Sequence, residues 1–209
     1  AALRVGRCRA RGHRRAEARN ATDWSGAGGA ERGGVRIGDT VAVFAQGPIG
    51  LCAAAGAKLA GATLVIGVDR LPARLHTARA LGIDAVIDAG TLDPVNEILR
   101  LTDGRGVDIV VESTGKFKTK TDLGLHIKNG AKKVILSVPP LDDSIKMVVL
   151  GVNEDILDKD DQIISNASCT TNNAAPMIKV INELCGIEQA YITTVHSYTS
   201  DQSLHDSPH

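Results

Sequence analysis

Short apolar runs and longer amphipathic stretches alternate through most of the chain. Runs of mostly apolar residues are typical of buried strands, and they predict strands at 41–44, 64–68, 84–87, 107–111, 131–138, 147–151, 162–165 and 190–194. Apolar residues spaced three or four positions apart predict helices at 49–60, around 71–81 and after Pro94. Asp93 and Pro94 suit the N-cap and the first position of the third helix. The predicted buried face of the second helix comprises Leu71, Leu75, Ala78 and Leu81. Strands alternating with helices indicate a parallel sheet with right-handed crossovers.

A turn that contains glycine connects the first predicted strand and helix. Gly47 and Gly50 would let backbone N–H groups approach a pyrophosphate at the helix N-terminus. Ala45 stands where the full dinucleotide fingerprint has its first glycine. Asp69 ends the next strand about 20 residues beyond this turn, where a carboxylate binds the ribose hydroxyls. This carboxylate favours NAD over NADP, although two nearby arginines argue weakly the other way.

The longest predicted helix begins next to a single thiol. Its predicted buried face comprises Ala174, Met177, Ile178, Ile181, Leu184 and Cys185, with Gly186 as a stop signal. Cys169 precedes this face, where unpaired N–H groups and the helix dipole favour a thiolate. His196 follows the predicted strand 190–194 and could activate that thiol. Most Cys and His pairs are unrelated, so the residue types alone do not establish catalysis.

The composition changes abruptly near Val110. All 14 arginines precede position 106, whereas nine of the ten lysines follow position 115. Asparagine shifts as well, from two residues before the junction to six after it. No folding principle requires such a switch. It favours a natural or artefactual chimera of two coding sequences over a single evolved enzyme.

Two motifs that follow the composition change near Val110 have highly specific residue sequences. The motifs are Ser168-Cys169-Thr170-Thr171-Asn172 and Thr193-Thr194-Val195-His196-Ser197-Tyr198-Thr199. They closely resemble the active-site signature of phosphorylating glyceraldehyde-3-phosphate dehydrogenases. The resemblance runs from about 110 to 209 and includes Glu112-Ser113-Thr114-Gly115, Gly130-Ala131-Lys132-Lys133-Val134-Ile135 and Gly151-Val152-Asn153-Glu154-Asp155.

This resemblance implies a mechanism and a set of site residues. Cys169 would attack glyceraldehyde 3-phosphate, His196 would act as general base, and inorganic phosphate would cleave the resulting thioester. The implied phosphate-binding hydroxyls are Ser168, Thr170 and Thr199, for which helix capping and strand-surface hydrogen bonds are the alternative roles. The implied nicotinamide-side contacts are Thr114, Gly115, Phe117 and Ser137.

Residues 36–110 resemble the cofactor domain of zinc-dependent medium-chain alcohol dehydrogenases. The stretches are Gly38-Asp39-Thr40-Val41-Ala42-Val43-Phe44, Gly47-Pro48-Ile49-Gly50-Leu51 and Leu101-Thr102-Asp103-Gly104-Arg105-Gly106-Val107-Asp108. In that family a separate domain binds the catalytic zinc. Cys8 and Cys52 have no partners at zinc-ligand spacing, and His13 and His76 have no neighbouring Glu-His or Cys-x-x-Cys motif, so we expect no metal site.

The balanced formal charge of zero predicts no general attraction to nucleic acid or to a membrane. Four cysteines without CxxC spacing fit a reducing cytoplasm. No apolar run reaches the length of about 18–20 residues that a membrane span needs. The expected partners are therefore small molecules. The two parent families imply a homo-oligomer, and the sequence leaves the oligomeric state of this chain open.

These elements predict an α/β fold: a Rossmann-type doubly wound parallel sheet followed by the truncated start of an α+β catalytic domain. The expected parts are an arm at 1–34, a hybrid NAD-binding domain at 35–165 and a truncated catalytic domain at 166–209. Eight arginines among Ala and Gly predict that the arm is disordered. A transit peptide, a nucleic-acid arm and out-of-frame translation are the alternatives.

The chain stops inside what would be the substrate-and-cofactor loop of the glyceraldehyde-3-phosphate dehydrogenases. We therefore expect a fragment with little activity. Three functional interpretations remain open: an enzyme or remnant of this dehydrogenase type, an alcohol dehydrogenase-type enzyme that would need zinc, and a nucleotide-binding module or chimeric product without catalysis.

Overall fold

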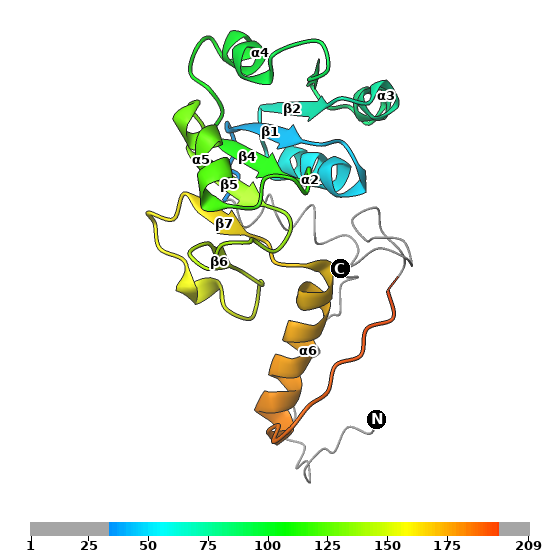
Figure 1. Ribbon diagram of the computed structural model, residues 1–209, viewed down its shortest axis with the longest axis vertical. Helices are drawn as coiled ribbons and strands as arrows, with labels where there is room; N and C mark the ends of the chain where they lie inside the picture. Colours follow the sequence, from blue (N-terminus) through cyan, green and yellow to red (C-terminus); the bar gives the residue numbers. More distant parts are fainter. Residues whose placement is uncertain (1–33, 197–209) are drawn as a thin grey trace. The chain divides into compact units, whose positions relative to one another are not determined.

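The computed structural model of the protein describes residues 34–196 (Figure 1). Thr199 and the predicted arm, apart from Gly34, lie outside the described residues. The described chain divides between two compact units, one that includes residues 34–176 and one that includes residues 177–196.

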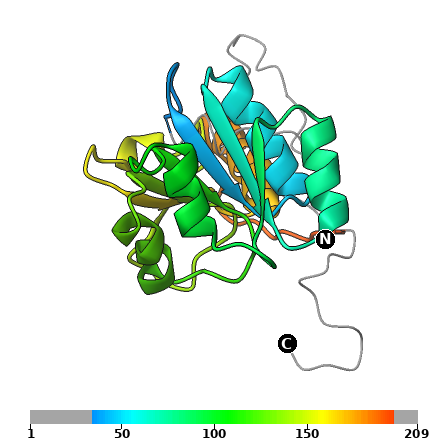
Figure 2. The same ribbon diagram turned by 90° about the horizontal axis from the view of Figure 1, so that it is seen from above.

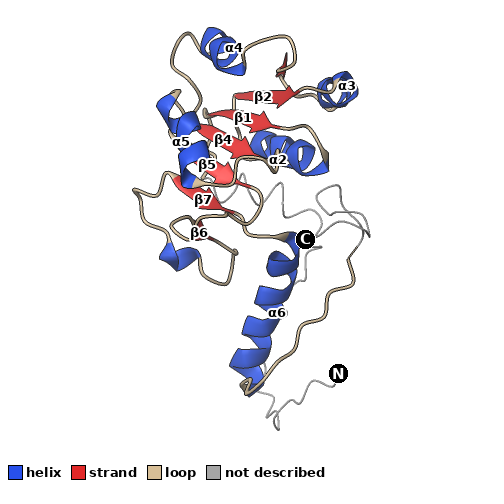
Figure 3. Cartoon of the chain, in the orientation of Figure 1, coloured by secondary structure: helices blue, strands red, loops and turns tan. Residues whose placement is uncertain are grey.

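Strands and helices alternate as the hydrophobic pattern predicts up to the strand at 109–112, which is followed by a helix at 120–128 that the pattern did not predict (Figure 3). The strands are β1 (Thr40–Phe44), β2 (Leu64–Asp69), β3 (Ala85–Asp88), β4 (Ile109–Glu112), β5 (Lys133–Leu136), β6 (Lys146–Met147) and β7 (Ile163–Ser165). The helices are α2 (Pro48–Leu59), α3 (Pro72–Ala80), α4 (Pro94–Leu101), α5 (Lys120–Lys128), the 3-10 helix η1 (Glu154–Ile156) and α6 (Cys169–Cys185).

The seven strands of the described chain form one parallel sheet in the order β3-β2-β1-β4-β5-β7-β6. The order reverses between β1 and β4, because the chain builds outward from β1 in one direction and then returns to continue in the other. In open α/β sheets, ligands bind at such a switch point, outside the carboxyl ends of the strands. The predicted Rossmann-type fold is confirmed.

Helices cover both faces of the sheet (Figure 2). Alternate residues of a strand point to opposite faces, so Val41 and Val43 pack with α2 and α3, whereas Ala42 packs with α4 and α5. The predicted face of α3 is only half right. Leu75 and Ala78 are buried, but Leu71 and Leu81 flank the helix and are exposed.

Local signals define the start of α4. The Asp93 side chain accepts a hydrogen bond from Asn96 N, and Pro94 is the first helical residue. Proline suits this position because its missing N–H would have no partner there. Both roles agree with the sequence prediction.

The strand predicted at 147–151 is wrong beyond Met147. The side-chain amide of Asn153 accepts a hydrogen bond from Val149 N at 2.8 Å and donates one to Met147 O at 3.0 Å. It thereby replaces strand pairing with a local turn.

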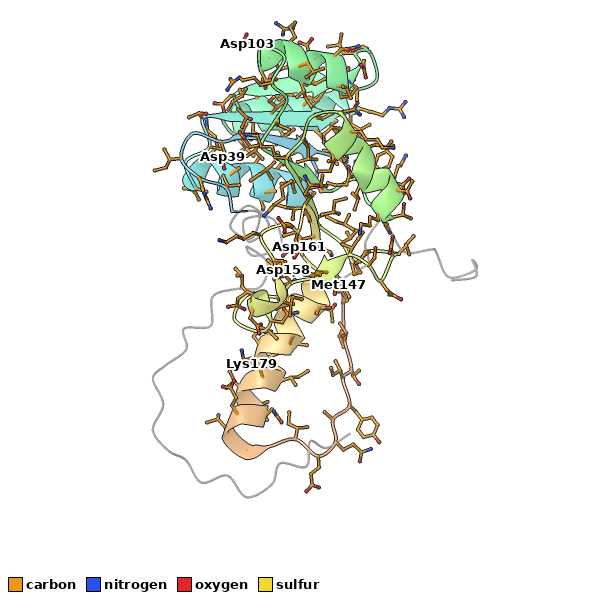
Figure 4. All side chains as sticks on the ribbon, turned by 90° about the vertical axis from the view of Figure 1, so that its left-hand side faces the viewer. Asp39, Asp103, Met147, Asp158, Asp161 and Lys179 are labelled. Atoms are coloured by element: carbon orange, nitrogen blue, oxygen red, sulfur yellow. The ribbon has the colours of Figure 1, made fainter. Side chains whose placement is uncertain are left out.

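Lys146 Nζ lies 2.6 Å from Asp158 and 2.8 Å from Asp161, two residues that Figure 4 labels beside Met147.

Two further predictions at the end of the described chain are corrected. No residue of α6 is buried, so its apolar stripe is not the buried face expected. Residues 190–194 have no regular secondary structure instead of forming a strand. Periodicity identifies which side of an element could be buried, but burial and strand formation both need a partner surface. Gly186 does end α6, with a left-handed φ of 70°.

Candidate dinucleotide site and thiol

The turn between β1 and α2 is tightly folded around two small residues. Ala45 has a φ of 70°, a left-handed conformation that costs a residue with a side chain about 1–2 kcal/mol. A Cβ atom on Gly50 would lie 1.8 Å from the carbonyl oxygen of Ala45, so this position requires glycine. The predicted role of Gly50 in a close backbone turn therefore has a specific steric cause.

Gln46 is a residue of this turn that the sequence analysis missed. Its side chain is buried, and Nε2 donates to Val43 O at 2.8 Å. Its backbone N–H donates to Oδ2 of Asp69 at 2.7 Å, while its own Oε1 has no hydrogen-bond partner. A polar side chain in a glycine turn normally predicts exposure, so the sequence contained no signal for its burial.

Asp69 ends β2 and organises the same turn. Its Oδ1 accepts hydrogen bonds from Arg70 N at 2.7 Å and Leu71 N at 2.9 Å. Burial opposes ionisation, but the N–H donors of Gln46, Leu71 and Arg70, together with the Arg74 guanidinium, lower the pKa of Asp69 below its ordinary value. The carboxylate is 8% exposed, so these contacts occupy most of its hydrogen-bonding capacity.

The N-terminus of α2 fits a bound dinucleotide phosphate. Its N-cap, Gly47, provides no side-chain hydrogen bond, and the first turn carries no acidic residue. The first N–H groups of a helix and its dipole together attract anions. The nearest atoms to a Cβ on Gly47 would belong to the Arg74 guanidinium at 3.9 Å, so the glycine surface is open next to a cation.

The end of β4 carries a buried carboxylate, Glu112. Its Oε1 accepts a hydrogen bond from Thr114 N at 2.8 Å, and its Oε2 lies 3.2 Å from His126 Nε2. The His126 ring lies 4.7 Å from the Phe44 ring and 6.3 Å from the Phe117 ring, measured between centroids. Gly115, with a φ of 71°, turns the chain away from the strand. Thr114, Gly115 and Phe117 thus follow the carboxyl end of β4.

Ser137 follows the carboxyl end of β5, the neighbouring strand. Its backbone N donates to Glu112 O at 3.0 Å, and its side chain is buried. The Oγ has no hydrogen-bond partner. A buried hydroxyl without a partner is unusual in a folded protein, and it is what a polar ligand at this edge would satisfy.

Cys169 is the first residue of α6 and is exposed. Ser168 caps this helix, since its Oγ accepts a hydrogen bond from Thr171 N at 3.0 Å. The preceding Ala167 has a left-handed φ of 56° although it is buried. Thr170 lies in the first turn. The predicted placement of the thiol at a helix N-terminus is confirmed. Ser168 caps the helix, and its role in phosphate binding stays a prediction.

His196 lies in the second unit, as the last residue that the structure describes. Its pairing with Cys169 stays a prediction. Within residues 34–196, no three His, Cys, Asp or Glu side chains gather as metal ligands. The described residues therefore do not fit a zinc ion. No helix in this part of the chain is both long and apolar enough to cross a membrane.

Comparison with known proteins identifies the family. A family model described as zinc-binding dehydrogenase matches residues 48–197, most of the chain. The chain belongs to the zinc-binding dehydrogenase family. Solved structures of alcohol dehydrogenases agree. The enzyme from Thermus sp. ATN1 is 26% identical with a TM-score of 0.54, covering 79% of this chain and 45% of that chain. Benzyl alcohol dehydrogenase from Acinetobacter calcoaceticus is 26% identical with a TM-score of 0.54, covering 78% and 44%.

The chain is also similar to curated glyceraldehyde-3-phosphate dehydrogenases. Glyceraldehyde-3-phosphate dehydrogenase from Priestia megaterium is 53% identical over 106 residues, covering 50% of this chain and 31% of that protein. The protein of the same name from Geobacillus stearothermophilus is 54% identical over 105 residues, with the same coverage. The chain spans about a third of the length of these curated relatives. Both resemblances drawn from the sequence are confirmed, and the fold is the NAD-binding fold of dehydrogenases.

Proposed function

We propose that the chain binds NAD(H) at the carboxyl edge of the sheet and oxidises an aldehyde through Cys169. The observation that carries the proposal is the open N-terminus of α2, where Gly47 leaves free space, Gly50 packs against the Ala45 carbonyl and the first turn carries no acidic side chain. Such a helix N-terminus stabilises a pyrophosphate.

Asp69 would hold the adenosine ribose. Three N–H groups and Arg74 already contact its two oxygens, so it offers at most one further acceptor position. Its depressed pKa keeps it anionic at neutral pH, and an anion at this point disfavours a 2′-phosphate. NAD is therefore the expected cofactor instead of NADP.

Thr114, Gly115, Phe117 and Ser137 would surround the nicotinamide. They follow the ends of β4 and β5, two adjacent strands on the far side of the switch point from Asp69. The unpartnered Ser137 hydroxyl supports this assignment, because a carboxamide offers both a donor and an acceptor to it. When bound, NAD would supply the hydride acceptor.

Cys169 would act as the nucleophile. The helix dipole of α6 and the N–H groups of its first turn favour the thiolate over the thiol. The thiolate would attack an aldehyde carbon, and protonated His196 would give its proton to the resulting alkoxide to form a hemithioacetal. His196 would take that proton back as a general base when the hydride leaves. The product at Cys169 is a thioester, which inorganic phosphate would cleave to an acyl phosphate and a restored thiolate.

The proposed substrate is glyceraldehyde 3-phosphate. Ser168, Thr170 and Thr199 would donate hydrogen bonds to the substrate phosphate and to inorganic phosphate, since phosphate oxygens need several convergent donors. The sequence identity of 53–54% between half of the chain and curated glyceraldehyde-3-phosphate dehydrogenases supports this choice.

Two measurements test the proposal separately. The first is NADH titration of the 209-residue chain by fluorescence, with Gly50→Ala as the variant expected to abolish binding. The second is iodoacetamide labelling at pH 7 followed by peptide mapping. Cys169 should react faster than Cys52, which is also exposed but lies inside α2. Equal rates at the two thiols would refute the nucleophile assignment.

A second function is a dinucleotide-binding module of the alcohol dehydrogenase type, without thiol chemistry. The family match over residues 48–197 favours it. Under this alternative the chain binds NADH, but Cys169 labels no faster than Cys52. NADH formation that requires glyceraldehyde 3-phosphate and is lost in Cys169→Ala would exclude it.

A further inference from the structure

Ser113 contacts the dinucleotide turn from the opposite side of the sequence junction. It follows β4, and its Oγ donates a hydrogen bond to Phe44 O at 2.6 Å. The same Oγ lies 3.2 Å from Ala45 O, as the weaker branch of a shared hydrogen bond. It would also lie 3.1 Å from a Cβ on Gly50. The hydroxyl therefore lies next to Phe44, Ala45 and Gly50.

These contacts hold the two peptide groups on either side of Ala45. In the peptide group between Phe44 and Ala45, Phe44 O accepts hydrogen bonds from both the N and the Oγ of Ser113, and Ala45 N donates one to Val68 O at 2.8 Å. In the second, Ala45 O faces Ser113 Oγ, and Gln46 N donates to Asp69. Ser113 Oγ reaches both carbonyls from just beyond the end of β4, and Gln46 Nε2 also donates to Ala45 O at 3.3 Å.

The left-handed φ of Ala45 needs such support. An alanine at a φ of 70° relaxes toward negative φ unless the flanking peptides are held. Rotation of either peptide would move the Ala45 carbonyl away from Gly50 and change the direction of the N–H groups at the start of α2. Those N–H groups are the proposed phosphate donors.

We propose that Ser113 is a positioning residue for NAD(H): its hydroxyl locks the peptides flanking Ala45 in the orientation that opens the helix N-terminus to phosphate. This role rests on the proposed dinucleotide site. It explains how the turn between β1 and α2, which precedes the composition change near Val110, keeps its conformation through a contact with a residue that follows this change. Ser113 itself would not touch the reacting atoms.

A double-mutant cycle on the full chain tests whether Ser113 holds the peptides that flank Ala45. Ser113→Ala should weaken NADH binding roughly tenfold, the effect of one hydrogen bond to a half-buried carbonyl. Glycine adopts positive φ without strain, so Ser113→Ala combined with Ala45→Gly should bind within about twofold of Ala45→Gly alone. Ser144→Ala, on an exposed loop residue, is the matched control and should leave affinity unchanged.

Amide hydrogen exchange in the absence of NADH gives an independent readout. Exchange of the Gln46 N–H should become faster in Ser113→Ala and return to the parent rate in the double variant. A chain that binds no NADH overturns the proposed function, and the exchange rates then still decide the lock. Unchanged affinity and exchange in Ser113→Ala, or an equal loss in both Ala45 backgrounds, would overturn the role of Ser113.

Discussion

Lys132 Nζ lies 2.6 Å from Oδ1 of Asp108, across the junction where the composition of the chain changes. The other carboxylate oxygen of Asp108 accepts hydrogen bonds from Thr40 N at 2.8 Å and Thr40 Oγ1 at 2.9 Å. One side chain thus connects β1, β4 and the start of β5. The two parts of the sequence form one sheet with satisfied hydrogen bonds at the junction, and not merely two adjacent fragments.

Asp108→Ala should lower the free energy of unfolding by about 1–3 kcal/mol, because the N–H of Thr40 is buried and loses its acceptor. Lys132→Ala should have a much smaller effect, since the lysine side chain is 77% exposed. Urea denaturation measures both. The exposed Asp143→Ala is the control, and an equal loss in Asp108→Ala and Asp143→Ala would contradict the prediction.

Stability should fall in acid through two carboxylates. Burial opposes ionisation of Asp108, but the Lys132 ammonium and the Thr40 donors lower its pKa below the ordinary 3.8. The pKa of Asp69 is also lowered. A carboxyl group with a depressed folded-state pKa stabilises the fold fully above its unfolded pKa, and this contribution disappears as the pH falls through the folded value.

Urea midpoints should therefore be nearly constant from pH 7 to 5 and decline below about pH 4. Asp108→Asn should show a shallower decline, because asparagine does not titrate. A decline of identical steepness in the variant would mean that Asp108 contributes nothing to the acid sensitivity.

Gly50→Ala should destabilise the chain by about 1–3 kcal/mol, the usual cost of overpacking, and abolish NADH binding. Its Cβ would overlap the Ala45 carbonyl oxygen, a backbone atom that cannot move without opening the turn. Gly124→Ala is the opposite case. Gly124 lies inside α5 with no atom within 4 Å of an added Cβ, so alanine should stabilise by about 0.5–1 kcal/mol. Thermal unfolding compares the two variants.

Glu112→Ala should be among the most destabilising substitutions, at about 3–5 kcal/mol. It removes a fully buried carboxylate that contacts Thr114 and His126. Glu112→Gln keeps an acceptor for Thr114 N and should lose distinctly less. Comparable losses in both variants would show that the carboxylate charge, and not its shape, stabilises this site.

Ser137→Ala should separate stability from binding. The Oγ of Ser137 is buried without a partner, so its removal should leave the unfolding free energy unchanged or slightly higher. If this hydroxyl contacts the nicotinamide, the NADH dissociation constant should rise several-fold. Wild-type affinity in Ser137→Ala would remove Ser137 from the site.

Local chemistry explains which elements could be predicted. The Asp93 cap with Pro94, the stop at Gly186 and the placement of Cys169 at a helix start depend on neighbouring residues only, and the structure confirms each. The strand predicted beyond Met147 failed because the Asn153 side chain competes for the same backbone groups. Apolar periodicity contains no information about such a side-chain competitor.

By itself, the sequence determined the alternation of strands and helices as far as β4, the parallel sheet and the position of the thiol, because hydrophobic period and capping act over a few residues. Only the tertiary structure decided that Gln46 is buried, that Ala45 is left-handed and that Ser113 holds the dinucleotide turn. Those properties depend on contacts between residues as many as 69 positions apart, and such contacts exist only once the sheet has brought β1 and β4 together.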